Sequence, residues 1–234
     1  MLTVKPNQNM IVDLESSRYN ELLRPMVECL KYSRISKALT KSESVPVVHL
    51  SSAYSSAVYN KKDEIINFEV ASHKTSISKS RFFKLLRFTS LENLVDPESI
   101  SSVDLQRMFW QMGYKGDISL LSKFKKFDLP PNWNALFTIL FKSFSERVTG
   151  IDTTSRLFYT IIYGLYNDIN LDYGSVLWNQ FVQSLTSSSR HSEVSCARFW
   201  SIVVHRAYSL QSAYHGRFGY GCNSLTLHSL FYHN

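Results

Sequence analysis

Residues 133–167 read WNALFTILFKSFSERVTGIDTTSRLFYTIIYGLYN, and this stretch carries the strongest helical signal in the chain. Apolar residues recur at every fourth position, as they do along one face of an α-helix. The two rows are Leu136, Leu140 and Phe144, then Leu157, Ile161 and Leu165. Gly150 separates them, and Asp152 or Thr153 can cap the second helix. We expect one helix over 133–148 and another that ends near residue 167.

Two further helical segments follow in the same half of the chain. Segment 174–185 again repeats apolar residues at every fourth position, and segment 192–206 places Phe199, Trp200, Val203 and Val204 on one face. Only a few residues connect the four helices, and short connections favour antiparallel neighbours. We therefore expect residues 131–207 to form a compact, apolar helical bundle.

The preceding region, residues 16–130, has less regular patterns. We expect helices over 16–32, where Pro25 allows a start as late as Arg24, and over 33–39, 78–87 and 101–112. Residues 47–59 are ambiguous and compatible with a poor helix. Residues 65–70 (IINFEV) are the best strand candidate, and a partner strand has to come from another segment, for example 46–49.

The two ends of the chain are expected to differ from the middle. Residues 1–15 are polar and are predicted to be frayed, and residues 208–234, which lack acidic residues and a clear period, are predicted to be loosely ordered. Residues 16–130 and 131–207 together fit one domain. The sequence thus predicts a mainly α fold with room for one short strand pair in the first half.

The charge of the chain favours anionic partners. Twenty-six lysines and arginines against 19 aspartates and glutamates give a formal net charge of +7, and the pI is about 9.2. Two basic clusters are candidates for nucleic-acid contact. In the second cluster Phe124 lies between two lysines and Phe127 follows the last lysine, and both rings could stack on bases. The clusters are Arg81, Lys84 and Arg87, on one face of the expected helix 78–87, and Lys123, Lys125 and Lys126, in the connector 119–129.

No motif in the sequence predicts a catalytic, metal-binding or cofactor-binding site. Cys29, Cys196 and Cys222 are far apart and form no CxxC pair, which excludes a disulfide framework or a common zinc site. His191 and His205 lie five and nine positions from Cys196, too far round or along a helix for a Cys–His pair. We expect no catalytic residues, no metal, no cofactor and no small-molecule substrate.

A transposase would need carboxylates that hold two divalent ions. The candidates in the second half are Asp152, Asp168, Asp172 and Glu193. Asp152 is better explained as a helix cap, and Asp168 and Asp172 as residues that bond the backbone of their own loop.

Targeting signals are not evident in the sequence. Residues 1–13 contain no apolar h-region, and no run approaches the 18 or so apolar residues of a membrane span. We therefore expect an intracellular protein, cytoplasmic or nuclear, that does not interact with a membrane.

Several blocks of the sequence are distinctive, and the most specific are FKSFSERVTG (141–150), YGLYNDINLDYGSVLW (163–178) and RHSEVSCARFWSIVV (190–204). Two further stretches are FEVASHKTSISKSRFFKLL (68–86) and VDPESISSVDLQRMFWQMGYKGD (95–117). Together these blocks resemble a family of plant proteins labelled as transposon or retrotransposon (gag-like) proteins. The resemblance covers about residues 20–206, and residues 208–234 depart from the family pattern. The family supplies no catalytic residues to carry over.

The resemblance implies a structural or interaction protein derived from a plant mobile element. Such a protein would act without catalysis, by self-association into a homo-oligomer or by partner docking through its helical half, with weak nucleic-acid contact alongside. The alternatives are a DNA-binding or transposase-like component, and a degenerate relic without function.

Overall fold

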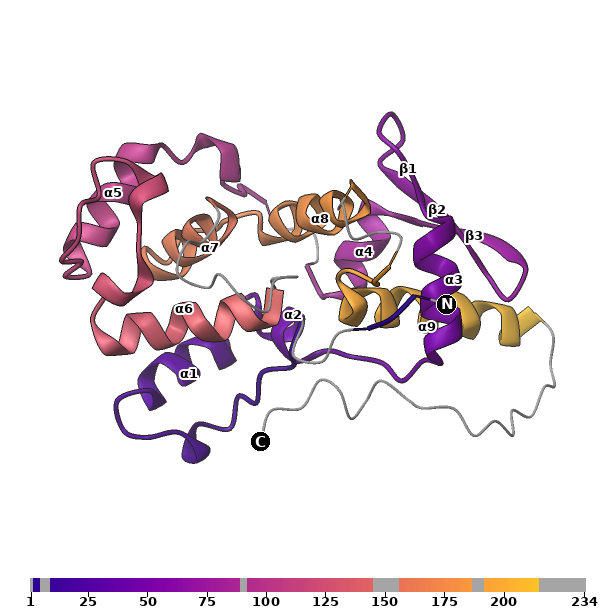
Figure 1. The fold of residues 1–234 in the computed structure, drawn as a ribbon, viewed down its shortest axis with the longest axis horizontal. Coiled ribbons are helices and arrows are strands. Elements are labelled where there is room, and N and C mark those ends of the chain that lie inside the picture. The colour runs from indigo at the N-terminus through magenta and orange to yellow at the C-terminus, as the bar shows by residue number, and fades with distance from the viewer. Residues whose placement is uncertain (1, 5–8, 89–91, 145–155, 187–191, 215–234) are drawn as a thin grey trace.

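The computed structural model describes residues 2–4, 9–88, 92–144, 156–186 and 192–214. Its elements lie in two groups along the long axis of the molecule (Figure 1). Helices α1, α5, α6 and α7 lie at one end, and α3, α4, α9 and a small sheet lie at the other, with α2 and α8 between them. One hydrophobic core runs through both groups.

The described part of the chain is mainly helical, as predicted, with nine α-helices. Short 3-10 turns lie at Ser16–Arg18, Pro97–Ser99, Leu121–Lys123, Lys126–Asp128 and Ser184–Thr186. The helices are α1 (Arg24–Tyr32), α2 (Ser36–Thr40), α3 (Val47–Ser56), α4 (Lys79–Leu85), α5 (Ser102–Gln111), α6 (Pro131–Phe144), α7 (Arg156–Tyr166), α8 (Tyr173–Gln183) and α9 (Ala197–Tyr214).

Local sequence signals explain most of the helix starts. Pro25 lies in the first turn of α1, which begins at the late position that the proline allowed. Ser78 accepts a hydrogen bond from the backbone N–H of Arg81 and so caps α4. Ser101 and Asp104 form a reciprocal capping box at the start of α5. The proposed cap of α7, Asp152 or Thr153, lies outside the described residues.

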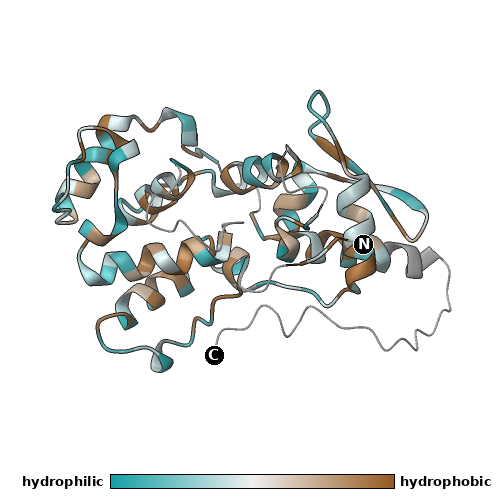
Figure 2. Ribbon diagram, in the orientation of Figure 1, coloured by the Kyte–Doolittle hydropathy of each residue, from teal (hydrophilic) through white to brown (hydrophobic). Residues whose placement is uncertain are grey.

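The sheet is larger than the predicted strand pair. Strands β1 (Val58–Asn60), β2 (Ile65–Val70) and β3 (His73–Ser78) form an antiparallel meander in the order β1-β2-β3. The predicted strand 65–70 is therefore confirmed, but a partner from 46–49 is wrong, because residues 47–49 open α3. The sequence did not indicate β3, because this strand contains two serines and a lysine and its one buried apolar residue is Ile77. The β1–β2 tip is hydrophilic and projects from the molecule (Figures 1 and 2).

One face of the sheet packs into the core and the other faces solvent. Ile66, Phe68 and Val70 of β2 are buried beside α3, and the ring of Phe68 meets Trp200 of α9 edge to face at 5.5 Å. Alternation along β2 turns Asn67 and Glu69 to the open face.

The last described helix differs from its prediction at both ends. A start at Ser192 is wrong, because Glu193 forms a parallel bridge with Thr3, whose backbone bonds Ser192 and Val194 on either side. Cys196 then takes a left-handed backbone (φ 52°), and α9 begins after it and continues to Tyr214, past the expected end at 206. Helix α9 packs on α3 and α4, so the helical bundle draws on both halves of the chain.

The N-terminal segment takes part in the fold. Residues 1–15 were predicted to be frayed, yet Met10, Ile11, Val12 and Leu14 are buried in the core. The backbone N–H of Met10 donates to the carbonyl of Lys142, and that of Val12 to the carbonyl of Leu39. The apolar run MIV supplies the burial that the polar residues around it cannot.

A buried arginine ties these segments together. Arg198, in the first turn of α9, has no exposed surface. All five N–H donors of its guanidinium are used, on the carbonyls of Asn9, Ala38 and Lys41 and on the carbonyl and hydroxyl of Ser143. Arg198 thus joins the N-terminal segment, α2, α6 and α9.

No helix among the described residues is both long and apolar enough to cross a membrane.

Candidate anion-binding groove

A groove of about 490 Å³ lies between α4 and α9, and its rim is basic. We call it the basic groove. Three separate segments supply its walls: the loop after α2, the end of β3 with α4, and the middle of α9. Its lining consists of Lys41, Glu43, Ile77, Arg81, Lys84, Leu85, Ile202, His205, Arg206 and Ser209.

Two of the predicted nucleic-acid contacts line this groove. Arg81 and Lys84 lie one turn apart on α4, while Phe82 and Leu86 on its other side are buried. The amphipathic pattern of the segment therefore predicted correctly which side of α4 faces solvent. Arg87, the third predicted residue, is exposed directly after α4.

Two cations that local sequence patterns did not indicate complete the groove. Lys41 comes from the loop after α2 and Arg206 from α9, 165 positions further along the chain. The ammonium of Lys41 donates to the carbonyl of Leu85 at 3.1 Å and so caps the C-terminal end of α4. Only the tertiary fold brings these two residues beside Arg81 and Lys84.

The cations of the groove repel one another. Partial burial lowers the pKa of Lys41, and the nearby charges of Lys37, Arg87 and Arg206 lower it further, while Glu43 opposes them. Glu43 is the one carboxylate among the described residues of the lining. Within the part of the chain that the structure describes, Arg81, Lys84, Arg87 and Arg206 form no ion pair. These four cations are therefore available to an external anion.

The second predicted cluster is arranged differently. Lys126 is buried, at 7% exposure, and its ammonium donates to the hydroxyl of Thr138 at 2.9 Å. Lys123 pairs with Asp117 at 2.8 Å, and this bond holds the pKa of Asp117 well below its usual range. Lys125 remains exposed.

The aromatic residues of this cluster also separate. Phe124 is fully buried and stacks on Tyr114, with ring centroids 5.1 Å apart, so it offers no face to a base. Phe127 is 64% exposed. The alternation of lysine and phenylalanine here reflects a folded connector, whose burial the sequence did not indicate.

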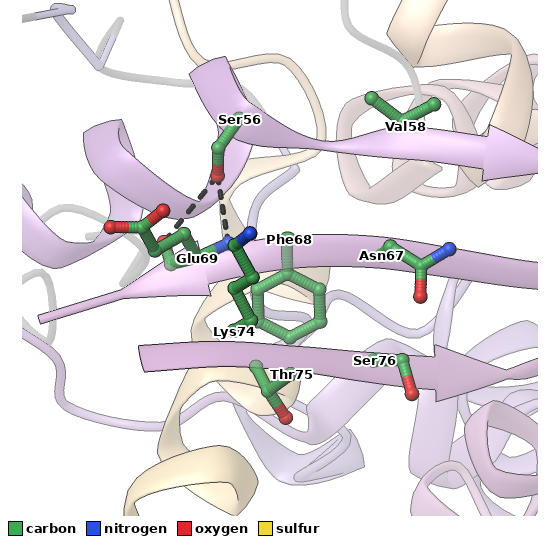
Figure 3. A pocket seen from close by; sticks show the side chains of 8 residues that line it. All are labelled: Ser56, Val58, Asn67, Phe68, Glu69, Lys74, Thr75 and Ser76. Atoms are coloured by element: carbon green, nitrogen blue, oxygen red, sulfur yellow. Dashed lines mark hydrogen bonds between the residues drawn. The ribbon is translucent and has the colours of Figure 1, made fainter. Parts of the chain in front are cut away.

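A second depression lies on the sheet (Figure 3). Asn67, Glu69, Lys74 and Ser76 line it from the open face, beside Ser56 at the end of α3. The hydroxyl of Ser56 accepts from the backbone N–H of Glu69 at 2.8 Å, where β1 no longer pairs with β2. These side chains complete the sheet and do not converge on a reactive centre.

Of the carboxylates considered for metal binding, Asp168, Asp172 and Glu193 lie among the described residues, and Asp152 does not. Asp172 caps α8 by accepting from the N–H of Ser175 at 2.9 Å, so it bonds the helix that follows and not, as predicted, the backbone of its own loop. No group of three or more His, Cys, Asp or Glu residues that could hold a metal ion occurs in the described ranges. Cys196 is buried, and His205 lies more than two turns along α9 at the exposed groove.

Comparison with protein-family models, with curated proteins and with solved structures finds no match to this chain.

Proposed function

We propose that this chain is a non-enzymatic interaction protein that binds the phosphate backbone of a nucleic acid in the basic groove. One observation carries the proposal: Lys41, Arg81, Lys84 and Arg206 converge from three segments on one groove, whose described lining contains a single carboxylate. Such an arrangement neutralises phosphates and releases their counterions. The role agrees with the resemblance to gag-like proteins of plant mobile elements.

The lining also suggests which part of the nucleic acid is recognised. Among the described residues, no phenylalanine, tyrosine or tryptophan lines the groove, and its apolar residues, Ile77, Leu85 and Ile202, offer no planar face. Stacking on bases needs aromatic side chains. We therefore expect contact with phosphates alone, with affinity that depends on salt and not on base sequence.

Fluorescence anisotropy with labelled DNA oligonucleotides tests this proposal. If Lys41, Arg81, Lys84 and Arg206 each neutralise a phosphate, the logarithm of the binding constant falls with the logarithm of the salt concentration, with a slope of about −3 to −4. The double variant Arg81→Ala/Lys84→Ala should lower affinity at least about tenfold and make the slope shallower by about two.

The control removes two charges elsewhere. Lys61 and Lys62 lie at the exposed tip between β1 and β2, so Lys61→Ala/Lys62→Ala changes the net charge equally without touching the groove. The proposal fails if both double variants lose the same affinity, since binding would then depend only on net charge.

A second candidate function, partner docking or self-association, is favoured by α5. Val103 and Trp110 lie seven positions apart, on the same side of this helix, and are 59% and 74% exposed. An exposed tryptophan is a frequent anchor of protein interfaces. Residues 131–207 are less suited to this role than the sequence suggested, because several of their large aromatic side chains are buried in the core. They include Trp178, Phe181, Phe199 and Trp200.

A further inference from the structure

Among the described residues that line the basic groove, one carboxylate lies beside the cations. The Oε1 atom of Glu43 is 3.9 Å from the ammonium of Lys41, and its Oε2 atom is 3.7 Å from Nδ1 of His205. Both distances exceed the 2.7–2.9 Å or so of a direct charge-assisted hydrogen bond. Glu43 therefore attracts the ammonium of Lys41, and the imidazole of His205 when it is protonated, without a tight bond to either.

Hydrogen bonds fix the backbone on both sides of the Lys41–Glu43 pair. The N–H of Glu43 donates to the hydroxyl of Ser201 on α9 at 3.3 Å. Lys41, two residues before Glu43, is fixed as well. Its carbonyl accepts a hydrogen bond from Arg198 at 2.9 Å, and its ammonium donates to the carbonyl of Leu85 at the end of α4. The carboxylate and the ammonium thus face each other from anchored positions.

We infer that Glu43 acts as an internal competitor for the anionic partner. When no partner is bound, the carboxylate of Glu43 lies next to Lys41 and His205. A phosphate group of the partner must displace this carboxylate in order to reach them. This inference rests on the function proposed above and concerns the regulation of the same groove.

The loose geometry supports exchange and not a permanent ion pair. The side chains of Lys41 and Glu43 are 20% and 30% exposed, so water reaches both and a phosphate can approach Lys41 without unfolding the loop. Lys41 cannot follow a displaced Glu43, since Leu85 holds its ammonium at the rim. The cation therefore stays where the phosphate arrives.

Removing the carboxylate should strengthen binding. Glu43→Gln keeps the backbone bond to Ser201 and raises the charge of the groove by one. One unit charge about 4 Å away, screened as in bulk water, corresponds to about a fivefold change in affinity at low salt. The gain should shrink as salt rises, because the groove is open to solvent.

The experiment measures anisotropy of a labelled single-stranded DNA of about 20 nucleotides in about 50 mM salt. It compares wild type, Glu43→Gln and the control Glu21→Gln. Glu21 is exposed in the loop before α1, and its loss gives the same change of net charge. Helix α1 lies at the opposite end of the molecule from α4 and α9 (Figure 1). Thermal melts establish that each variant is folded.

Tighter binding by Glu43→Gln than by Glu21→Gln supports the competitor role. Equal affinity of the two variants overturns it, and so does weaker binding by Glu43→Gln, which would mean that Glu43 only organises the cations. The Arg81→Ala/Lys84→Ala variant separates the two proposals: if it loses affinity while Glu43→Gln gains none, the groove binds nucleic acid and only the competitor role fails. If wild type does not bind, both fail.

Discussion

The guanidinium of Arg198 donates two hydrogen bonds to Ser143, one to its carbonyl oxygen at 3.0 Å and one to its hydroxyl at 3.1 Å. Ser143 lies near the end of α6 and Arg198 at the start of α9, so this contact joins the two groups of helices seen in Figure 1. Burial lowers the pKa of Arg198 to about 9, and the group remains charged at neutral pH. Its charge meets carbonyl and hydroxyl oxygens, and no carboxylate from the described ranges pairs with it.

Replacing Arg198 should destabilise the fold strongly. Arg198→Met leaves the buried carbonyls of Asn9, Ala38 and Lys41 without their donor, and we expect a loss of about 3–5 kcal/mol in the free energy of unfolding. Urea denaturation measures it. Arg18→Ala is the control: Arg18 pairs with Asp13 at an exposed position, and its loss should cost under about 1 kcal/mol. Similar losses in the two variants would contradict the role of Arg198.

Replacing Arg87 with glycine should stabilise the fold and weaken nucleic-acid binding. Arg87 follows α4 with a left-handed backbone (φ 61°), a position that favours glycine, and the N–H of Phe88 closes the helix end on the carbonyl of Phe83 at 2.8 Å. Arg87→Gly should stabilise the fold by about 1 kcal/mol. It should also weaken oligonucleotide binding about two- to threefold, because one cation near Lys41 is lost.

Arg87→Ala is the matched control for this variant. It removes the same charge but keeps a Cβ in the left-handed conformation, so it should weaken binding equally without the gain in stability. Unchanged affinity in both variants would exclude Arg87 from the electrostatics of the groove. Thermal melts and anisotropy titrations give the two readouts.

His49 should make stability depend on pH. Partial burial, beside the ring of Tyr208 at 5.0 Å, lowers the pKa of His49 below its ordinary value of about 6.5. The unfolded chain therefore binds a proton more readily than the folded chain, and the contribution of His49 is lost as pH falls from about 7 to 5. His49→Phe keeps an aromatic ring and should flatten this dependence in urea titrations. An unchanged slope would assign the dependence to other groups.

Trp110 should affect association and not folding. Since its side chain is 74% exposed, Trp110→Ala should change stability by no more than about 0.5 kcal/mol. If α5 docks a second copy, light scattering should show a concentration-dependent rise in mass for wild type and none for the variant. Tyr32→Ala, at another exposed aromatic residue on α1, should behave as wild type. A wild-type chain that stays monomeric at all concentrations would leave α5 without a role in self-association.

Periodic burial made much of the fold predictable. Rows of apolar residues at every fourth position define α6, α7 and α8, and caps such as Ser78 and Ser101 mark helix starts because their side chains bond nearby backbone. Strand β3 and helix α3 carry weak local signals, since their sequences are rich in serine. Contact with β2 decides their structure, and such a contact between segments has no local signature.

Local sequence patterns predict the helical class and the exposed basic face of α4, because helix periodicity and caps act over a few positions. The excess of positive charge follows from composition alone. The fold, by contrast, brings Lys41 and Arg206 beside Arg81 and Lys84, buries Lys126 and Phe124, and places Glu43 among the cations. These outcomes depend on packing between segments up to 165 positions apart, where loop closure and burial, and not local propensity, set which residues meet.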